Sequence, residues 1–124
     1  MNIANNQNNK IINTYSNWSI NSKLHNISAM EAIINKNSSF SEITNLYKKS
    51  RALGIDYYYE FSSVKVIEII NTPHSALVEG DIMLIQSNKK LNFKGKFKSD
   101  CLLETIDNKG NSWKLNELEI DWEI

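Results

Sequence analysis

The fold is indicated most clearly by residues 93–103, Phe-Lys-Gly-Lys-Phe-Lys-Ser-Asp-Cys-Leu-Leu. The odd positions of this segment hold apolar or small side chains, and its even positions hold charged ones up to Asp100. Side chains of a β-strand point in turn to the two faces of the sheet. The segment therefore predicts a half-buried strand. Its inner face would carry Phe93, Gly95, Phe97, Ser99, Cys101 and Leu103.

The C-terminal segment predicts the hairpin partner of this strand. A turn at 107–111 is followed by apolar residues at odd positions up to Leu115 and at even positions from Leu118. Because strand side chains have a period of two, one extra residue near Asn116-Glu117, a β-bulge, keeps both sets on the inner face. The expected register places Phe97 opposite Trp122, Cys101 opposite Leu118, Leu103 opposite Leu115, Lys98 opposite Asp121 and Lys96 opposite Glu123.

Two further strands precede this hairpin. Residues 57–70 are rich in aromatic and β-branched residues, which is typical of a strand. A turn at 71–74 leads to residues 76–86, whose nearly continuous apolar composition predicts a central strand. The polar residues 87–92 would form a loop.

The first half of the chain predicts three helices. Ile11, Tyr15, Trp18 and Ser22 recur at helical spacing. Two capping boxes, Ser28 with Glu31 and Ser39 with Glu42, would open the next helices. The first carries Met30, Ile33 and Ile34; the second has an apolar side of Ile43, Leu46, Tyr47 and Leu53 and ends at Gly54.

Helices followed by an antiparallel sheet with one apolar face predict an α+β fold. We expect three N-terminal helices packed on a curved, cone-like sheet of four antiparallel strands, in a single domain spanning residues 10–124. Residues 1–9, which include five asparagines, would form a disordered lead-in.

The charge balance argues against binding to nucleic acid. Fourteen basic residues match fourteen acidic ones, so the formal net charge is zero. Alternation separates Lys94, Lys96 and Lys98 from the phenylalanines and sets acidic residues across from them. We expect no nucleic-acid partner. No apolar stretch is long enough for a membrane span.

No catalytic or metal-binding pattern appears, and we expect no cofactor. His25 and His74 have no carboxylate at helical or alternating spacing, so both are expected at the surface. Cys101 lies on the predicted inner face, where a free cysteine usually behaves as a small hydrophobic side chain. An alternative stays open: Cys101, Trp113 and Trp122 could line a cavity of a small-molecule-binding protein or an enzyme.

The run Tyr57-Tyr58-Tyr59-Glu60-Phe61 is the densest aromatic cluster in the chain. It is compatible with a core strand, in which only Tyr58 points to the other face. It is also compatible with a recognition surface, because tyrosine contributes a large contact area at little cost in rotamer freedom.

The pattern as a whole resembles the intermembrane-space (IMS)-type domain at the C-terminal end of chloroplast-division proteins of the accumulation-and-replication-of-chloroplasts type and their cyanobacterial relatives. It is similar also to the nuclear-transport-factor-2-like superfold. The resemblance covers about residues 10–120 and departs from the family at 82–85, which lack its usual acidic residue. The matching stretches are Tyr15-Ser16-Asn17-Trp18 with Lys23, residues 57–66, Ala76-Leu77-Val78-Glu79, and residues 102–115 with Asp107, Gly110 and Trp113-Lys114-Leu115.

The resemblance implies a non-catalytic protein-interaction module whose groove receives a peptide segment of a partner protein. We expect Tyr58, Tyr59 and Phe61 near that groove, and a homo-oligomer is a further possibility. The resemblance also implies a plastid protein or a cyanobacterial cytoplasmic one. Asn, Ile and Lys are over-used and Arg51 is the only arginine, which is typical of an A+T-rich genome and favours an organelle-encoded chain.

Overall fold

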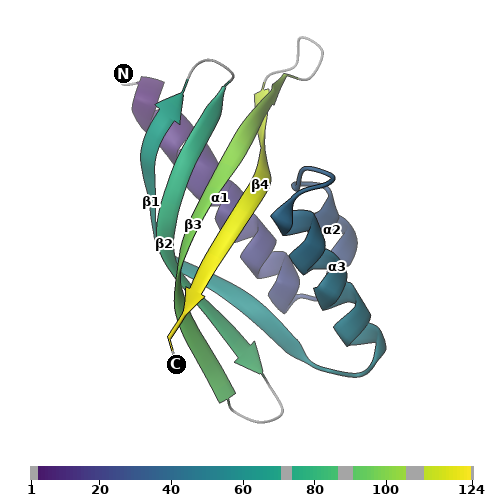
Figure 1. Ribbon diagram of the computed structural model, residues 1–124. Helices are drawn as coiled ribbons and strands as arrows, with labels where there is room; N and C mark the ends of the chain where they lie inside the picture. The colour runs from purple at the N-terminus through teal and green to yellow at the C-terminus, as the bar shows by residue number, and fades with distance from the viewer. Residues whose placement is uncertain (1–2, 71–73, 87–90, 106–110, 124) are drawn as a thin grey trace.

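Helices precede strands along the chain, as expected for the α+β class. The computed structural model describes residues 3–70, 74–86, 91–105 and 111–123. Helix α1 lies along one face of the sheet, while α2 and α3 lie beside β4 (Figure 1). Within the described residues, the elements are α1 (Ile3–Lys23), α2 (Ile27–Glu31), α3 (Ser39–Ala52), β1 (Tyr57–Ile70), β2 (Ser75–Gln86), β3 (Leu91–Thr105) and β4 (Asn111–Trp122).

The described strands form one antiparallel sheet in the order β1-β2-β3-β4. The central position predicted for β2 is confirmed. Strand β1 has the predicted bounds. It contains two register shifts that were not predicted from the sequence, one of them at Ser63, whose φ is 51°. The turns expected at 71–74, 87–92 and 107–111 lie largely outside the described residues.

The predicted bulge in β4 is confirmed, but the hairpin register differs from the prediction by two residues, and by three at Cys101, because the bulge lies opposite Asp100 and not opposite Leu102. Ser99 pairs with Leu118 and Cys101 with Leu115, so Asn116 and Glu117 hold the extra residue. Phe97 lies opposite Ile120 and not Trp122. A shift of two residues leaves every side chain on its predicted face, so alternation alone cannot distinguish the two registers. By the same shift, Leu103 pairs with Trp113, Lys98 with Glu119 and Lys96 with Asp121.

Side chains of β3 bind the backbone that the bulge removes from the sheet ladder. The Asp100 carboxylate accepts hydrogen bonds from the Glu117 backbone N–H at 2.8 Å and from Asn116 Nδ2 at 3.1 Å. Ser99 Oγ donates to the Glu117 carbonyl oxygen at 2.6 Å. These contacts satisfy polar groups that would otherwise lack partners, and they fix the position of the bulge.

The apolar stripe predicted for α1 is confirmed, since Ile11, Tyr15, Trp18 and Ser22 are all fully buried. Residues 3–9 also belong to this helix, whereas a disordered lead-in was expected over residues 1–9. Extending an existing helix costs far less than nucleating one. A tertiary contact holds this first part, because Trp113 Nε1 donates to Gln7 Oε1 at 3.0 Å.

The helix caps and the buried face of α3 differ from the prediction. Asn26 caps α2 and Ser38 caps α3, each by accepting a backbone N–H, in place of Ser28 and Ser39. The buried side chains of α3 are Phe40, Thr44 and Tyr47, whereas Leu46 and Leu53 are exposed. Thr44 is accommodated in the core because its hydroxyl donates to the Phe40 carbonyl and accepts from Trp18 Nε1. Gly54 ends α3 at a φ of +82°, as predicted.

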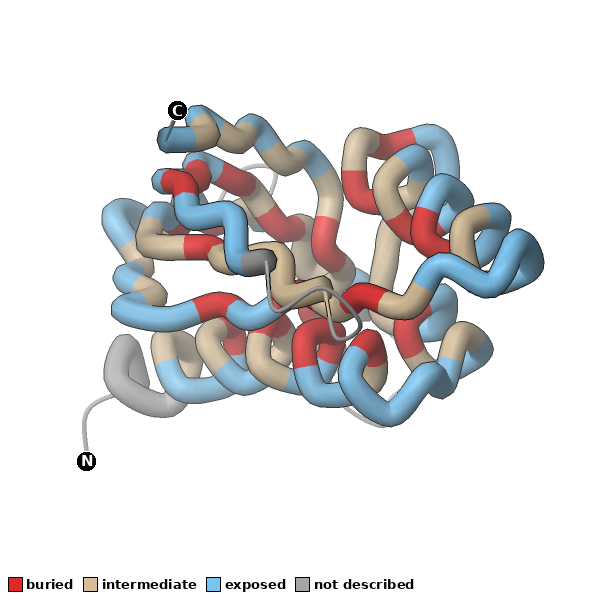
Figure 2. The backbone as a smooth tube through the Cα atoms, turned by 90° about the horizontal axis from the view of Figure 1, so that it is seen from below, coloured by how far each residue is buried: buried red, intermediate tan, exposed pale blue. Residues whose placement is uncertain are grey.

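The core is an aromatic layer between α1, α3 and the inner face of the sheet. Buried segments of these elements face one another across the interior (Figure 2). Ring centroids lie 4.8–6.2 Å apart, mostly in edge-to-face or tilted arrangements that aromatic quadrupoles favour. The rings that form this layer are Tyr15, Trp18, Phe40, Tyr59, Phe61 and Phe97.

Candidate functional site

An apolar groove of about 360 Å³ lies between α3 and the inner face of the sheet. Helix α3 provides one wall, and all four strands contribute to the rest. Leu46 is 58% exposed and Phe93 is 46% exposed, so large hydrophobic side chains of this groove meet solvent. The groove is lined by Ile43, Leu46, Tyr59, Leu84, Phe93, Ile120 and Trp122.

Glycine 95 shapes the sheet side of the groove. A Cβ at this position would lie 2.8 Å from the Asp121 carbonyl oxygen and 3.1 Å from Trp122 Cε3. Only glycine therefore lets the Trp122 ring approach the β3 backbone this closely. Trp122 is partly buried, packs against the core and presents its remaining surface to the groove.

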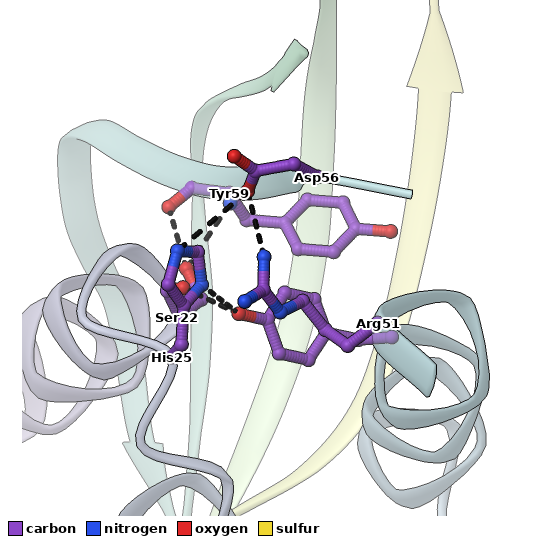
Figure 3. A network of polar contacts seen from close by, with 6 residues as sticks. Ser22, His25, Arg51, Asp56 and Tyr59 are labelled. Carbon is purple, nitrogen blue, oxygen red and sulfur yellow. Dashed lines mark hydrogen bonds and ion pairs between the residues drawn. The ribbon is translucent and has the colours of Figure 1, made fainter. Parts of the chain in front are cut away.

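A network of polar side chains joins the ends of α1 and α3 to the start of β1 (Figure 3). Arg51 Nη1 donates to Asp56 Oδ1 at 2.7 Å, and His25 Nε2 lies 3.6 Å from the same oxygen. On the inner side, Tyr47 Oη donates to the Ser22 carbonyl at 2.6 Å and lies 2.9 Å from His25 Nδ1. The network fixes α3, and thereby the helical wall of the groove, relative to α1 and β1.

This network was not predicted from the sequence, because Asp56 approaches His25 from a different element. Burial raises the pKa of the Tyr47 hydroxyl, and the nearby Arg51 charge partly offsets this rise. The hydroxyl thus stays protonated and able to donate to Ser22. The role of the network is therefore structural: it holds the end of α3 against the end of α1 and the start of β1.

The three residues expected to bind a partner lie together but do not share one environment. Tyr59 and Phe61 are only 4% and 9% exposed and belong to the core, while Tyr58 is half-buried on the opposite side of β1. All three line a second, smaller hollow of about 250 Å³ between α1 and β1, where Lys23 Nζ lies 5.6 Å from the Tyr58 ring centroid. Of the three, Tyr59 alone lines the apolar groove.

Most groove residues were missed because their sequence signal is the same as that of core residues. Phe93, Ile120 and Trp122 were assigned to the inner face of the sheet, which is correct, and Leu46 to the buried side of α3. Alternation gives the face of a side chain, but it does not tell how far a helix covers that face.

The residues of the alternative cavity are not brought together. Cys101 is fully buried and Trp113 is 5% exposed, so both pack in the core, while Trp122 lines the groove. Burial raises the pKa of the Cys101 thiol to about 12, so at neutral pH it is protonated and a poor nucleophile. Within the described part of the chain, no group of three or more His, Cys, Asp or Glu side chains is placed to hold a metal ion.

The outer face of the sheet carries alternating charges. Lys98 lies opposite both Glu79 and Glu119, and Lys96 lies opposite Asp81 and Asp121. Lys96 Nζ donates to Asp81 Oδ1 at 2.6 Å, and this bond lowers the pKa of the carboxyl group. The lysine stripe is therefore interleaved with carboxylates, as the cross-strand pattern predicted.

Comparison with known proteins identifies a structural neighbour but no sequence relative. The sequence matches no protein-family description and no curated protein. Among solved structures, the intermembrane-space region of the chloroplast protein ARC6 is similar to this chain, with a TM-score of 0.52 and 17% sequence identity. The match covers 87% of this chain and 91% of that region. At this identity the likeness is one of fold, and it supports the distant resemblance inferred from the sequence.

No helix among the described residues combines the length and hydropathy needed to cross a membrane.

Proposed function

We propose that this protein is a non-catalytic protein-interaction module that binds a segment of a partner protein in the apolar groove between α3 and the sheet. The observation that supports this most directly is the exposed apolar lining of the groove. Apolar surface gathered in a concave site is typical of interaction sites, because its burial is the main source of binding free energy.

The fold likeness to a plastid protein region is compatible with this proposal. On the same basis we propose a plastid location, with an organelle-encoded chain, and a cyanobacterial cytoplasm as the alternative. Tyr59 forms part of the groove lining, and Phe61 lies in the core. Tyr58, beside Lys23, would contribute to a neighbouring contact.

Selection from a peptide library displayed on phage tests this function. The groove variant is Leu46→Asp, which places a charge in the apolar lining. Its matched control is Leu53→Asp, because Leu53 directly follows α3, is 79% exposed and lies outside the groove lining. Both positions are exposed, so both variants are expected to fold, and circular dichroism checks this.

We expect the wild-type protein and Leu53→Asp to enrich a common set of peptides that Leu46→Asp fails to bind. A charge placed in an apolar site must lose its hydration when a peptide binds, and this penalty opposes binding. Equal enrichment by both variants would place binding elsewhere and contradict the proposal. The absence of any enrichment would contradict it as well.

A further inference from the structure

The free side of edge strand β4 is covered only in part. Leu115 donates its N–H to the Ile33 carbonyl at 2.9 Å, and its own carbonyl accepts from Asn35 N–H at 2.7 Å. The connection between α2 and α3 thus pairs with the first half of β4, in a parallel bridge. On the other edge of the sheet, hydroxyl groups of Ser19 and Ser22 bind the backbone of Tyr59.

The second half of β4 directs unpaired backbone groups outward. Glu123 N–H donates to the Lys94 carbonyl at 2.8 Å, which identifies a hydrogen-bonded pair. In an antiparallel ladder such pairs alternate with non-hydrogen-bonded ones. The backbone groups of Leu118, Ile120 and Trp122 therefore point away from β3. Among the described residues, none binds them there.

These outward groups are continuous with the apolar groove, because Ile120 and Trp122 also line it together with Ile43 and Leu46 of α3. A peptide lying in the groove along β4 would meet a row of free donors and acceptors and an apolar wall together. This combination is what strand addition to a sheet edge requires.

The charges along β4 indicate which peptide would fit. Glu119, Asp121 and Glu123 are exposed on the outer face of this strand. On their β3 side they face the lysines at 94, 96 and 98, and the Lys96 ion pair is made with Asp81. A strand added on the free side would place its own outer residues beside the same carboxylates, where basic side chains are favoured.

We infer that the partner segment binds as a fifth β-strand along Leu118–Trp122 and alternates basic with apolar residues. This inference rests on the proposed function and adds to it the mode of binding and the partner's chemistry. The apolar residues enter the groove, and the lysines or arginines lie on the outer face beside Glu119 and Asp121. Strand β3 has this pattern in Phe93-Lys94-Gly95-Lys96-Phe97 and pairs with β4 on the other side.

The same charges disfavour a second copy of this chain as the occupant. Pairing of β4 with β4 across a two-fold axis would set Glu119, Asp121 and Glu123 against an identical acidic row. Like charges directly opposite one another in a sheet are destabilising. A basic segment of a different protein avoids this repulsion.

The test uses a capped synthetic peptide, Val-Lys-Leu-Lys-Phe-Lys-Val, and two N-methylated forms that carry methyl groups on alternate sets of amides. In either strand orientation, only every second amide of an added strand faces β4. We expect one methylated form to lose affinity by about ten-fold or more and the other to bind like the parent. Equal affinities of the two forms would overturn strand addition.

A charge test uses the double variant Glu119→Gln/Asp121→Asn, with Glu60→Gln/Glu68→Gln on β1 as a control of equal net charge. We expect the first to lower affinity for the lysine peptide about three- to ten-fold, and the second by less than about two-fold. Equal effects of the two double variants would overturn the inference that the partner segment carries lysines or arginines beside Glu119 and Asp121. If Leu46→Asp abolishes peptide binding while both these tests fail, the proposed function stands and this inference falls. If no peptide binds the groove, both fall.

Discussion

Tyr15 Oη and Ser99 Oγ lie 2.6 Å apart in the core, and this contact joins α1 to β3 beside the bulge of β4. A serine hydroxyl has one proton, and Ser99 directs it to the Glu117 carbonyl at 2.6 Å. Tyr15 is therefore the donor in its own bond with Ser99. Burial raises the pKa of Tyr15 well above its ordinary value, which keeps the hydroxyl protonated for this role.

Replacing Tyr15 by phenylalanine removes this donor while leaving the ring. We expect Tyr15→Phe to lower the free energy of unfolding by about 1–2 kcal/mol, measured by urea denaturation followed by tryptophan fluorescence. Tyr58→Phe is the control, because the Tyr58 hydroxyl bonds to no described residue, and it should cost less than about 0.5 kcal/mol. Similar losses for both variants would show that the Tyr15–Ser99 contact adds nothing.

The glycine beneath Trp122 gives a second prediction. A methyl group at position 95 would clash with the Asp121 carbonyl oxygen and with Trp122, so Gly95→Ala should lower the free energy of unfolding by about 1–3 kcal/mol. Gly54→Asn is the comparison, because no atom lies within 4 Å of a Cβ there and asparagine tolerates a positive φ. A Gly95→Ala protein as stable as Gly54→Asn would contradict the close approach of Trp122.

Faces and element order could be predicted from the sequence because both follow from periodicity. The stripe of α1 and the bulge at Asn116-Glu117 each rest on a repeat of apolar residues that the structure preserves. The bounds of β1 follow instead from its aromatic and β-branched composition. The register of β4 could not be predicted, since a shift of two residues changes no face.

Features that depend on contacts between distant elements also escaped prediction. Thr44 is buried because Trp18 and Phe40 satisfy its hydroxyl, and nothing local to α3 indicates this. Leu46 is thereby displaced from the core to the groove wall. His25 and Asp56 meet because two helices end near the start of β1. The groove exists only as a result of these placements, so the sequence predicted a groove through family resemblance alone.

The buried thiol predicts how stability responds to alkaline pH. Burial disfavours the thiolate and so raises the pKa of the Cys101 thiol from 9.0 to about 12. Below the pKa of the exposed thiol, Cys101 is protonated in both the folded and the unfolded state, so its contribution to the free energy of unfolding is fully present. Above it, the unfolded state loses its proton first, and stability falls with rising pH by up to about 1.4 kcal/mol per unit until the folded value is reached.

Urea denaturation at a series of pH values between about 8 and 11 measures this dependence. Cys101→Ala should be less stable at the lowest pH, because a buried side chain is truncated, but its unfolding free energy should fall less steeply with pH. A slope unchanged by the substitution would mean that the thiol is accessible to water in the folded protein.

The two tryptophans of β4 should behave differently when each is truncated. Trp113 is 5% exposed and its indole donates to Gln7, so Trp113→Ala should lower the free energy of unfolding by about 3–5 kcal/mol. A loss below about 1 kcal/mol would show that Trp113 is not part of the helix–sheet core.

Trp122 is only partly buried and lines the groove. Trp122→Ala should therefore cost less stability than Trp113→Ala and weaken peptide binding more, as measured by urea denaturation and by titration with the lysine peptide. The reverse order in both measurements would exclude Trp122 from the binding site, because a residue that contributes to the core without touching the ligand changes folding and leaves affinity unchanged.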